Sequence, residues 1–261
     1  MVRWNGNNFF LSYFRRKPKL TFLDHHIVEI GTGDWYQGWG ILLILCLSVL
    51  YLLPRLGRKG MRSAEKVWAL LLFLSWGLEQ VVLIRTGNWD ATWALPLQLC
   101  SLSGMLTIFT LITRNKWTYL FVLFWGISGG LHSFLTPEMT LGGQGVLFFT
   151  YIFWHSSIIA MPLYFFFQHK WGIPRNAFLI VWGWTHFVWL AVGILDYTIG
   201  ANYMYVMEPP LVDNPFVQGA FPYHLIGFEI AGILHFGLTH LVFRKLQKIK
   251  SIGESPIWLS A

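Results

Sequence analysis

Charged side chains are scarce in this chain: Asp, Glu, Lys and Arg together account for 12% of its 261 residues. Because a soluble domain carries about 25% charged residues, the composition argues against an ordinary soluble fold. Cysteine is also rare, and Cys46 and Cys100 lie in separate apolar runs, which excludes a disulfide framework and a zinc-type spacing. The sequence contains no phosphate-binding glycine loop and no Gly-x-Ser-x-Gly motif. We therefore expect neither a metal ion nor another cofactor.

Apolar residues are abundant instead, at 55% of the chain, and they are gathered into long runs. A helix needs about 20 such residues to cross the hydrocarbon layer, and backbone groups in lipid must be hydrogen-bonded within the segment. We therefore expect an all-α polytopic membrane protein with a bundle of seven transmembrane helices. The runs lie near residues 38–53, 67–84, 92–112, 117–135, 146–167, 178–199 and 221–243.

These runs divide the chain into three parts. Residues 1–37 form an N-terminal tail with a possible interfacial segment, residues 38–243 the transmembrane domain, and residues 244–261 a C-terminal tail. We find no low-complexity segment or clear internal repeat, so the transmembrane part is expected to be a single domain.

The basic residues predict how the chain is oriented. They gather in alternate connections and after the last run, whereas the opposite connections carry mostly acids. The positive-inside rule then places the C-terminus in the cytoplasm and the N-terminus outside. A basic stretch near the N-terminus lies about 20 residues or more from the first run, where charge counts less. The net charge of +7 is explained by topology and attraction to anionic lipid, and nucleic acid is not an expected partner.

Polar side chains inside the predicted helices concentrate in the outer half of the membrane. Polar groups are costly there and usually mark function. Cys100 lies about eight residues into the run 92–112, and His155 about nine residues into the run 146–167. Since both runs start on the outer side, the thiol and the imidazole are expected at about the same depth, roughly 12–14 Å below the boundary.

The pair indicates a nucleophile, Cys100, with its general base, His155, and an acid such as Glu79 or Asp196 could orient the imidazole. Taken singly, a buried thiol is more often an inert small hydrophobe, and a histidine in a span is often a helix–helix contact. Further polar residues are candidates for supporting or substrate-binding roles: Gln98, His132, Asn202, Tyr203 and His224. Of these, His132 is either a second site histidine or a rim residue in contact with water, and Asn202 either donates to an oxyanion or caps a turn.

Four stretches of this sequence resemble the YwaF-like family of bacterial membrane proteins: Leu95–Cys100 (LPLQLC), Gly129–Pro137 (GGLHSFLTP), His155 in its predicted helix, and Gly200–Tyr205 (GANYMY). That family is similar to eukaryotic transmembrane acyltransferases that remodel ether phospholipids. The resemblance implies a seven-helix, metal-free fold in the bacterial cytoplasmic membrane, with Cys100 as nucleophile and His155 as the membrane histidine.

Two positions depart from the family pattern. His132 stands where the family more usually has Gln, and Glu208 stands before a proline where Lys is common. Both departures concern contacts with the substrate headgroup and leave the central pair intact.

The sequence leaves three functions open. A lipid acyltransferase or acyl-ester hydrolase would take a phospholipid or lysolipid from the outer leaflet and form a thioester on Cys100. A transporter or channel for a small solute or proton is the second, although the predicted inner half offers little polar lining. A non-catalytic scaffold is the third. The acyl chain, the headgroup, transfer versus hydrolysis and the oligomeric state are not specified by the sequence.

Overall fold

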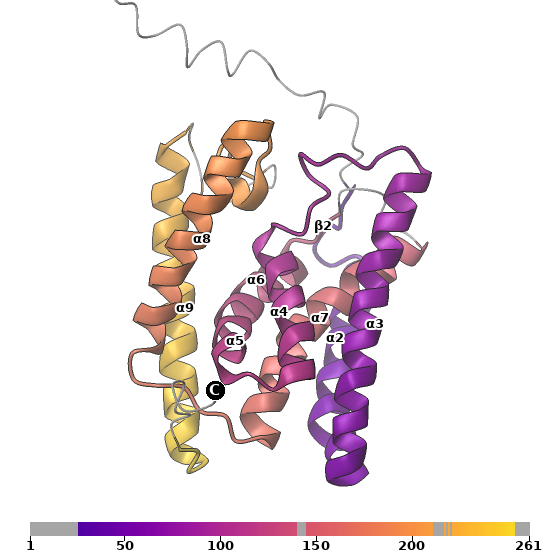
Figure 1. Ribbon diagram of the computed structural model, residues 1–261, viewed down its shortest axis with the longest axis vertical. Helices are drawn as coiled ribbons and strands as arrows, with labels where there is room; N and C mark the ends of the chain where they lie inside the picture. The colour runs from indigo at the N-terminus through magenta and orange to yellow at the C-terminus, as the bar shows by residue number, and fades with distance from the viewer. Residues whose placement is uncertain (1–25, 140–144, 211–216, 218, 220, 254–261) are drawn as a thin grey trace, which may run out of the picture.

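The computed structural model describes residues 26–139, 145–210, 217, 219 and 221–253, which are mostly helical (Figure 1). In chain order the helices are α2 (Gly33–Leu47), η2 (Ser48–Leu52), η3 (Leu53–Leu56), α3 (Gly57–Arg85), α4 (Leu99–Thr113), α5 (Lys116–Phe121), η4 (Val122–Gly126), α6 (Ile127–Leu135), α7 (Gly145–Gln168), α8 (Ala177–Ile199), η5 (Tyr203–Tyr205) and α9 (Tyr223–Ile249). Two short strands, β1 (His26–Ile27) and β2 (Glu138–Met139), pair antiparallel. The expectation of an all-α protein is confirmed.

Five helical stretches in the described residues are long and apolar enough to cross a membrane. They are Gly33–Arg85, Lys116–Leu135, Gly145–Gln168, Ala177–Ile199 and Tyr223–Ile249. The first contains α2 and α3 with η2 and η3 between them, and the chain turns at Gly57, whose φ of 66° suits a residue without a Cβ. Both α2 and α3 pack against α7. α4 is a shorter apolar helix.

The predicted helix over 92–112 begins seven residues late, at Leu99. Hydrogen bonds from outside the helical ladder hold the preceding backbone in turns. Asp90 accepts from the backbone N–H and the hydroxyl of Thr92, at 2.8 and 2.7 Å. The N–H of Leu95 donates to the phenol oxygen of Tyr203 at 2.9 Å. Because these side chains form hydrogen bonds with the backbone, the segment does not have to be helical in order to be buried.

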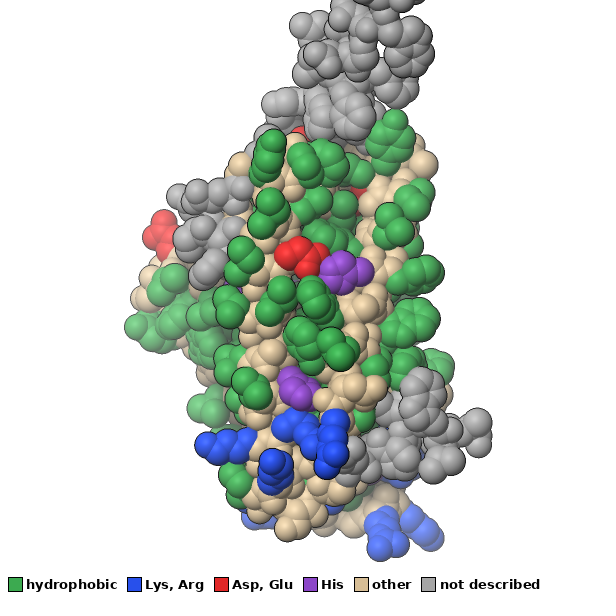
Figure 2. Space-filling view, turned by 90° about the vertical axis from the view of Figure 1, so that its left-hand side faces the viewer, with side chains coloured by type: hydrophobic (Ala, Val, Ile, Leu, Met, Phe, Trp, Pro, Cys, Tyr) green, Lys and Arg blue, Asp and Glu red, His purple; other side chains and the backbone are tan. Residues whose placement is uncertain are grey.

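The interior of the bundle is formed by α7 and the α5–η4–α6 stretch, while α3, α8 and α9 direct many apolar side chains outward. Figure 2 shows the outward face on the side of α8 and α9, which is largely apolar, with an acidic side chain beside a histidine in its middle and with Lys and Arg gathered at one end. Such a surface suits contact with lipid. α9 runs on to Ile249, so the predicted boundary at residue 243 is not the end of the helix.

One end of the bundle is tied together by a buried carboxylate that does not stand out in the sequence. The side chain of Glu65 is fully buried, and Arg114 holds it with two hydrogen bonds of 2.9 Å. Arg62, Tyr164 and His169 lie 2.9–3.1 Å from the same carboxylate. Because these groups come from α3, the end of α4 and the end of α7, the cluster fixes three helices at their basic end.

The helices α8 and α9 pack on each other and lie side by side at the edge of the bundle (Figure 1). A hydrogen bond of 2.6 Å joins His186 of α8 to Glu229 of α9. A second one of 2.9 Å joins His235 of α9 to His132 of α6. The two polar contacts hold this helix pair together and attach it to the interior helices.

Candidate functional site

Cys100 lies in the first turn of α4, where three helices meet. Its sulfur is 3.7 Å from the hydroxyl oxygen of Ser133 on α6. The same hydroxyl donates to the Gly129 carbonyl at 3.0 Å, so the thiol S–H is the group that donates to Ser133. A Cβ at Gly129 would lie 2.9 Å from the sulfur, which makes glycine necessary for this approach. Trp154 of α7 donates from Nε1 to the Cys100 carbonyl at 3.1 Å.

His155 lies one turn after Tyr151 on α7. Its Nδ1 is 2.8 Å from the Tyr151 carbonyl oxygen. Because a carbonyl can only accept, Nδ1 carries the proton, and Nε2 of the neutral ring keeps its lone pair. The Tyr151 ring packs on the imidazole with a centroid separation of 4.1 Å. Nε2 is thus the nitrogen that is able to act as a base.

Ser133 connects the two halves of this cluster. Its hydroxyl contacts the Cys100 thiol, and its carbonyl accepts a hydrogen bond of 3.2 Å from the Tyr151 hydroxyl. Cys100 and His155 therefore belong to one contact network formed by α4, α6 and α7. They share no direct hydrogen bond with each other. Catalysis by this pair would require the two side chains to approach each other or another group to bridge them.

Neither of the two acids considered for orienting the imidazole makes a hydrogen bond to His155. Glu79 is exposed on α3 and makes no hydrogen bond or ion pair with any residue that the structure describes. Asp196 is fully buried near the end of α8 and interacts with the backbone of Tyr203. The Tyr151 carbonyl orients His155 instead, because a backbone acceptor one turn earlier on the same helix is already in place.

Gln98 and Tyr203 hold the Gly200–Tyr205 segment over the start of α4. Gln98 Oε1 accepts from the Met204 N–H at 2.8 Å. The Tyr203 hydroxyl accepts from the Leu95 N–H and donates to the Ala91 carbonyl at 2.8 Å. The Tyr203 hydroxyl therefore has a structural role and is not available to an oxyanion. The Nε2 amide of Gln98 is not used in this contact.

Asn202 and His224 also serve the backbone. Asn202 Oδ1 accepts from the N–H groups of Met207 and Glu208, both at 3.0 Å, and its Nδ2 donates to the Glu208 carbonyl. Asn202 thus closes a turn, the second of the two roles considered for it. His224 is buried, and its Nε2 is 3.0 Å from the Tyr205 carbonyl oxygen. Both residues shape the segment above the cluster.

His132 pairs with His235 and makes no hydrogen bond to Cys100 or His155. Its ring and that of His235 lie 4.7 Å apart between centroids. The residues that the structure describes contain no group of three or more His, Cys, Asp or Glu side chains able to hold a metal ion. The two histidines thus link helices α6 and α9.

Tyr205 is a further neighbour that the sequence reading did not single out. Both Tyr205 and Tyr151 come within electrostatic range of Cys100. Tyr205 has a φ of 53°, in the left-handed region that non-glycine residues seldom occupy. The sequence could have indicated both residues, because Tyr205 is the last residue of the GANYMY stretch and Ser133 lies inside GGLHSFLTP.

The start of α4 adds hydrogen-bond donors beside the thiol. Gln98 occupies the N-cap position, but its side chain does not bond back to the helix. Among the described residues none accepts a hydrogen bond from the N–H groups of Leu99, Cys100 or Ser101. The first N–H groups of a helix point outward and favour negative charge near them. The cluster therefore combines a thiol, a base and backbone donors.

The TMEM164 family model matches residues 31–240 of this chain. The matched range covers most of the sequence and contains every residue of the cluster around Cys100 and His155. No curated protein and no solved structure matches the chain.

Proposed function

This chain belongs to the TMEM164 family, and we propose that it is a membrane enzyme that transfers or hydrolyses lipid acyl groups through a thioester on Cys100. The observation that carries the proposal is the chain of contacts that links Cys100 at the start of α4 to Ser133, Ser133 to Tyr151, and Tyr151 to His155. The resemblance to YwaF-like proteins, and through them to phospholipid acyltransferases, supports the same chemistry. The substrate would be a phospholipid or lysolipid of the outer leaflet.

The first step is acylation of the thiol. His155 Nε2 takes the proton of Cys100, which requires the two side chains to approach each other, since no hydrogen bond joins them in the structure. The sulfur attacks the ester carbonyl of the lipid, a C–S bond forms and the C–O bond to the glycerol backbone breaks. His155 returns its proton to the departing lysolipid oxygen.

The second step reverses these movements. The hydroxyl of another lysolipid, or a water molecule, gives its proton to His155 and attacks the thioester. The C–S bond breaks and Cys100 recovers its proton. A lysolipid acceptor gives acyl transfer, and water gives hydrolysis. A lipid acceptor already dissolved in the same leaflet favours transfer.

The tetrahedral intermediate of both steps carries an oxyanion that needs donors. The N–H groups of Leu99, Cys100 and Ser101 meet this need, because they have no acceptor among the described residues and belong to a helix N-terminus. The helix dipole also favours the thiolate as it forms. Burial alone would disfavour that charge, so proton transfer to His155 has to accompany the attack.

The proposal includes a topology. We place seven segments across the bacterial cytoplasmic membrane by counting α2 with η2, α3 and α4 as separate spans, with the N-terminus outside and the C-terminus inside. The collection of Lys and Arg at one end of the apolar face in Figure 2 supports this orientation. Cys100 at the start of α4 then belongs to the outer side.

The test uses the purified full chain reconstituted with a defined phospholipid donor and an isotopically labelled lysolipid acceptor. We expect no acyl exchange with Cys100→Ala, and a rate about 100- to 10,000-fold lower with His155→Gln. Cys46→Ala is the matched control, since it removes the other free cysteine and should keep the wild-type rate. Unchanged exchange in Cys100→Ala contradicts the proposal, and solute uptake without an acyl product would favour a transporter.

A further inference from the structure

A polar pair lies on the outward face that α8 and α9 present together. His186 Nε2 is 2.6 Å from Glu229 Oε1, and 42% of the histidine side chain and 33% of the glutamate side chain are exposed. Figure 2 shows an acidic side chain beside a histidine in the middle of this largely apolar face. The pair therefore joins the two helices without being covered by the part of the chain that the structure describes.

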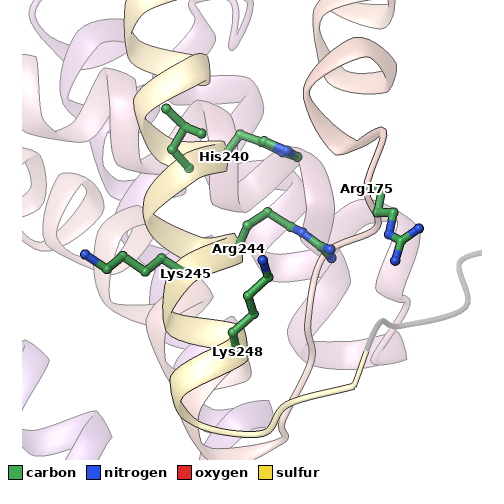
Figure 3. A pocket seen from close by; sticks show the side chains of 6 residues that line it. Arg175, His240, Arg244, Lys245 and Lys248 are labelled. Carbon is green, nitrogen blue, oxygen red and sulfur yellow. The ribbon is translucent and has the colours of Figure 1, made fainter.

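The pair lies far from the ends of the helices that carry it. Figure 3 shows Arg244, Lys245 and Lys248 at the basic end of α9. Glu229 comes 15 residues before Arg244, which is about 22 Å along a helix. His186 comes nine residues after the start of α8, or about 13 Å. Since both helices are long and apolar enough to cross a membrane, the pair belongs to the hydrocarbon layer, where lipid tails offer no hydrogen-bond donor.

One oxygen of this pair has no hydrogen-bond partner. His186 Nδ1 is 2.8 Å from the Trp182 carbonyl oxygen, so it carries a proton and donates. His186 Nε2 and Glu229 Oε1 share one proton between them. Glu229 Oε2 accepts no hydrogen bond from the described residues. Because an acceptor exposed to hydrocarbon is costly, this face calls for a donor from outside the chain.

A matching donor lies on the same face of the molecule. The Trp184 side chain is exposed on α8, and its indole N–H donates to none of the described residues. Trp184 comes two residues before His186, so the two positions differ in depth by about 3 Å. Around the helix they are about 160° apart. Within one chain the indole of Trp184 and the carboxylate of Glu229 therefore lie on opposite flanks of the exposed side of α8.

This arrangement is complementary to itself. Between the two flanks, Leu179, Phe187 and Leu190 project outward from α8. A twofold axis parallel to the membrane normal and running through this stripe would keep every residue at its own depth. The axis would also exchange the two flanks, as in an isologous interface. The donor flank of each copy then meets the acceptor flank of the other.

We infer that the outward face of α8 and α9 binds a second copy of this chain, with the Trp184 N–H of each protomer donating to Oε2 of the partner's Glu229. The contact satisfies the exposed oxygen twice, once in each protomer, and covers the apolar stripe between the flanks. The cluster around Cys100 is formed by α4, α6 and α7, so this inference does not depend on the proposed acyl transfer.

The test is Förster transfer between fluorescently labelled full-length chains in phosphatidylcholine liposomes, measured over a range of protein-to-lipid ratios. We expect the wild type to form dimers. Trp184→Phe should weaken association about tenfold to 100-fold, because it removes two symmetry-related hydrogen bonds and keeps an aromatic ring. Trp76→Phe is the matched control and should associate as the wild type does. Trp76 lies on α3, at the edge of the bundle away from α8 and α9 (Figure 1), and its indole N–H also has no partner among the described residues.

Two changes at Glu229 test the acceptor. Glu229→Gln keeps an oxygen that can accept and should associate nearly as the wild type does, whereas Glu229→Leu should lose as much as Trp184→Phe. The double variant Trp184→Phe/Glu229→Leu should lose no more than either single variant, since both remove the same bond. Unfolding midpoints check that each variant is folded. Trp184→Phe breaks no hydrogen bond within the described chain and decides the matter if Glu229→Leu is unstable.

A wild type that stays monomeric at every protein-to-lipid ratio would overturn the inference and leave lipid or a different protein as the cover of this face. Dimers that form equally well in Trp184→Phe and in the wild type would place the interface elsewhere and overturn it too. Equal losses in Trp184→Phe and Trp76→Phe would have the same consequence, because association would then follow tryptophan content rather than this face.

Discussion

Substitution of Gly129 by Ala tests how strongly the reactivity of the Cys100 thiol depends on the close packing of α6 against the sulfur. The added Cβ would lie 2.9 Å from the sulfur, whereas heavy atoms in contact normally lie about 3.5–4.0 Å apart. The thiol or α6 must therefore move by about 0.6–1.1 Å. A displacement of about 1 Å in a reacting group is expected to lower the rate about 100-fold.

The same change has a small expected effect on stability. Overpacking costs about 1–3 kcal/mol, and replacing glycine by alanine inside a helix returns about 1 kcal/mol. The free energy of unfolding should thus fall by about 0–2 kcal/mol. Acyl exchange per folded molecule, with the folded fraction taken from the unfolding midpoint, separates the two effects.

Gly183→Ala is the matched control for this experiment. Gly183 lies on α8, and a Cβ there would have no heavy atom within 4 Å. We expect wild-type exchange and equal or slightly higher stability from it. If Gly129→Ala exchanged acyl groups as fast as Gly183→Ala, the close contact between Gly129 and Cys100 would have no bearing on the reaction, and the reasoning would be refuted.

Three further predictions concern the supports of the bundle. Glu65→Gln should lower the free energy of unfolding by about 3 kcal/mol, because two arginines lose a buried carboxylate; an unchanged midpoint in denaturant would contradict the role given to the cluster. Tyr203→Phe should cost about 1–3 kcal/mol by leaving the Leu95 N–H without its partner, while acyl exchange per folded molecule persists, and a selective loss of exchange would show Tyr203 to be catalytic. In a double-mutant cycle of His132→Ala and His235→Ala, the coupling should be about 0.5–1.5 kcal/mol, and strict additivity would argue against their hydrogen bond.

The sequence predicted the helices best where apolar runs are long and uninterrupted. The run expected over 146–167 is α7 (Gly145–Gln168), and the run over 178–199 is α8 (Ala177–Ile199). The start of α4 was missed because its cause is not local. The Tyr203 hydroxyl, 108 positions away from Leu95, satisfies the backbone that would otherwise need a helix.

The candidate site could also be predicted only in part. Polar residues inside apolar runs indicated Cys100 and His155, and both belong to one network. Sequence supplies depth along a helix but not lateral position, so it could not show that Ser133 and Tyr151 lie between them. The charge of Glu79 made it a candidate for orienting His155, but the rotation of α3 about its own axis places this side chain on the outer surface.

The central claim is that Cys100 itself becomes acylated, and mass spectrometry of the peptide that contains it tests this most directly. After brief incubation of the reconstituted chain with a phospholipid donor and no acceptor, the account predicts that this peptide gains the mass of the donor's acyl group. Neutral hydroxylamine should remove the added mass, and the Cys46 peptide should stay unmodified. Continued turnover of the donor with an unmodified Cys100 peptide at every time point would contradict the account.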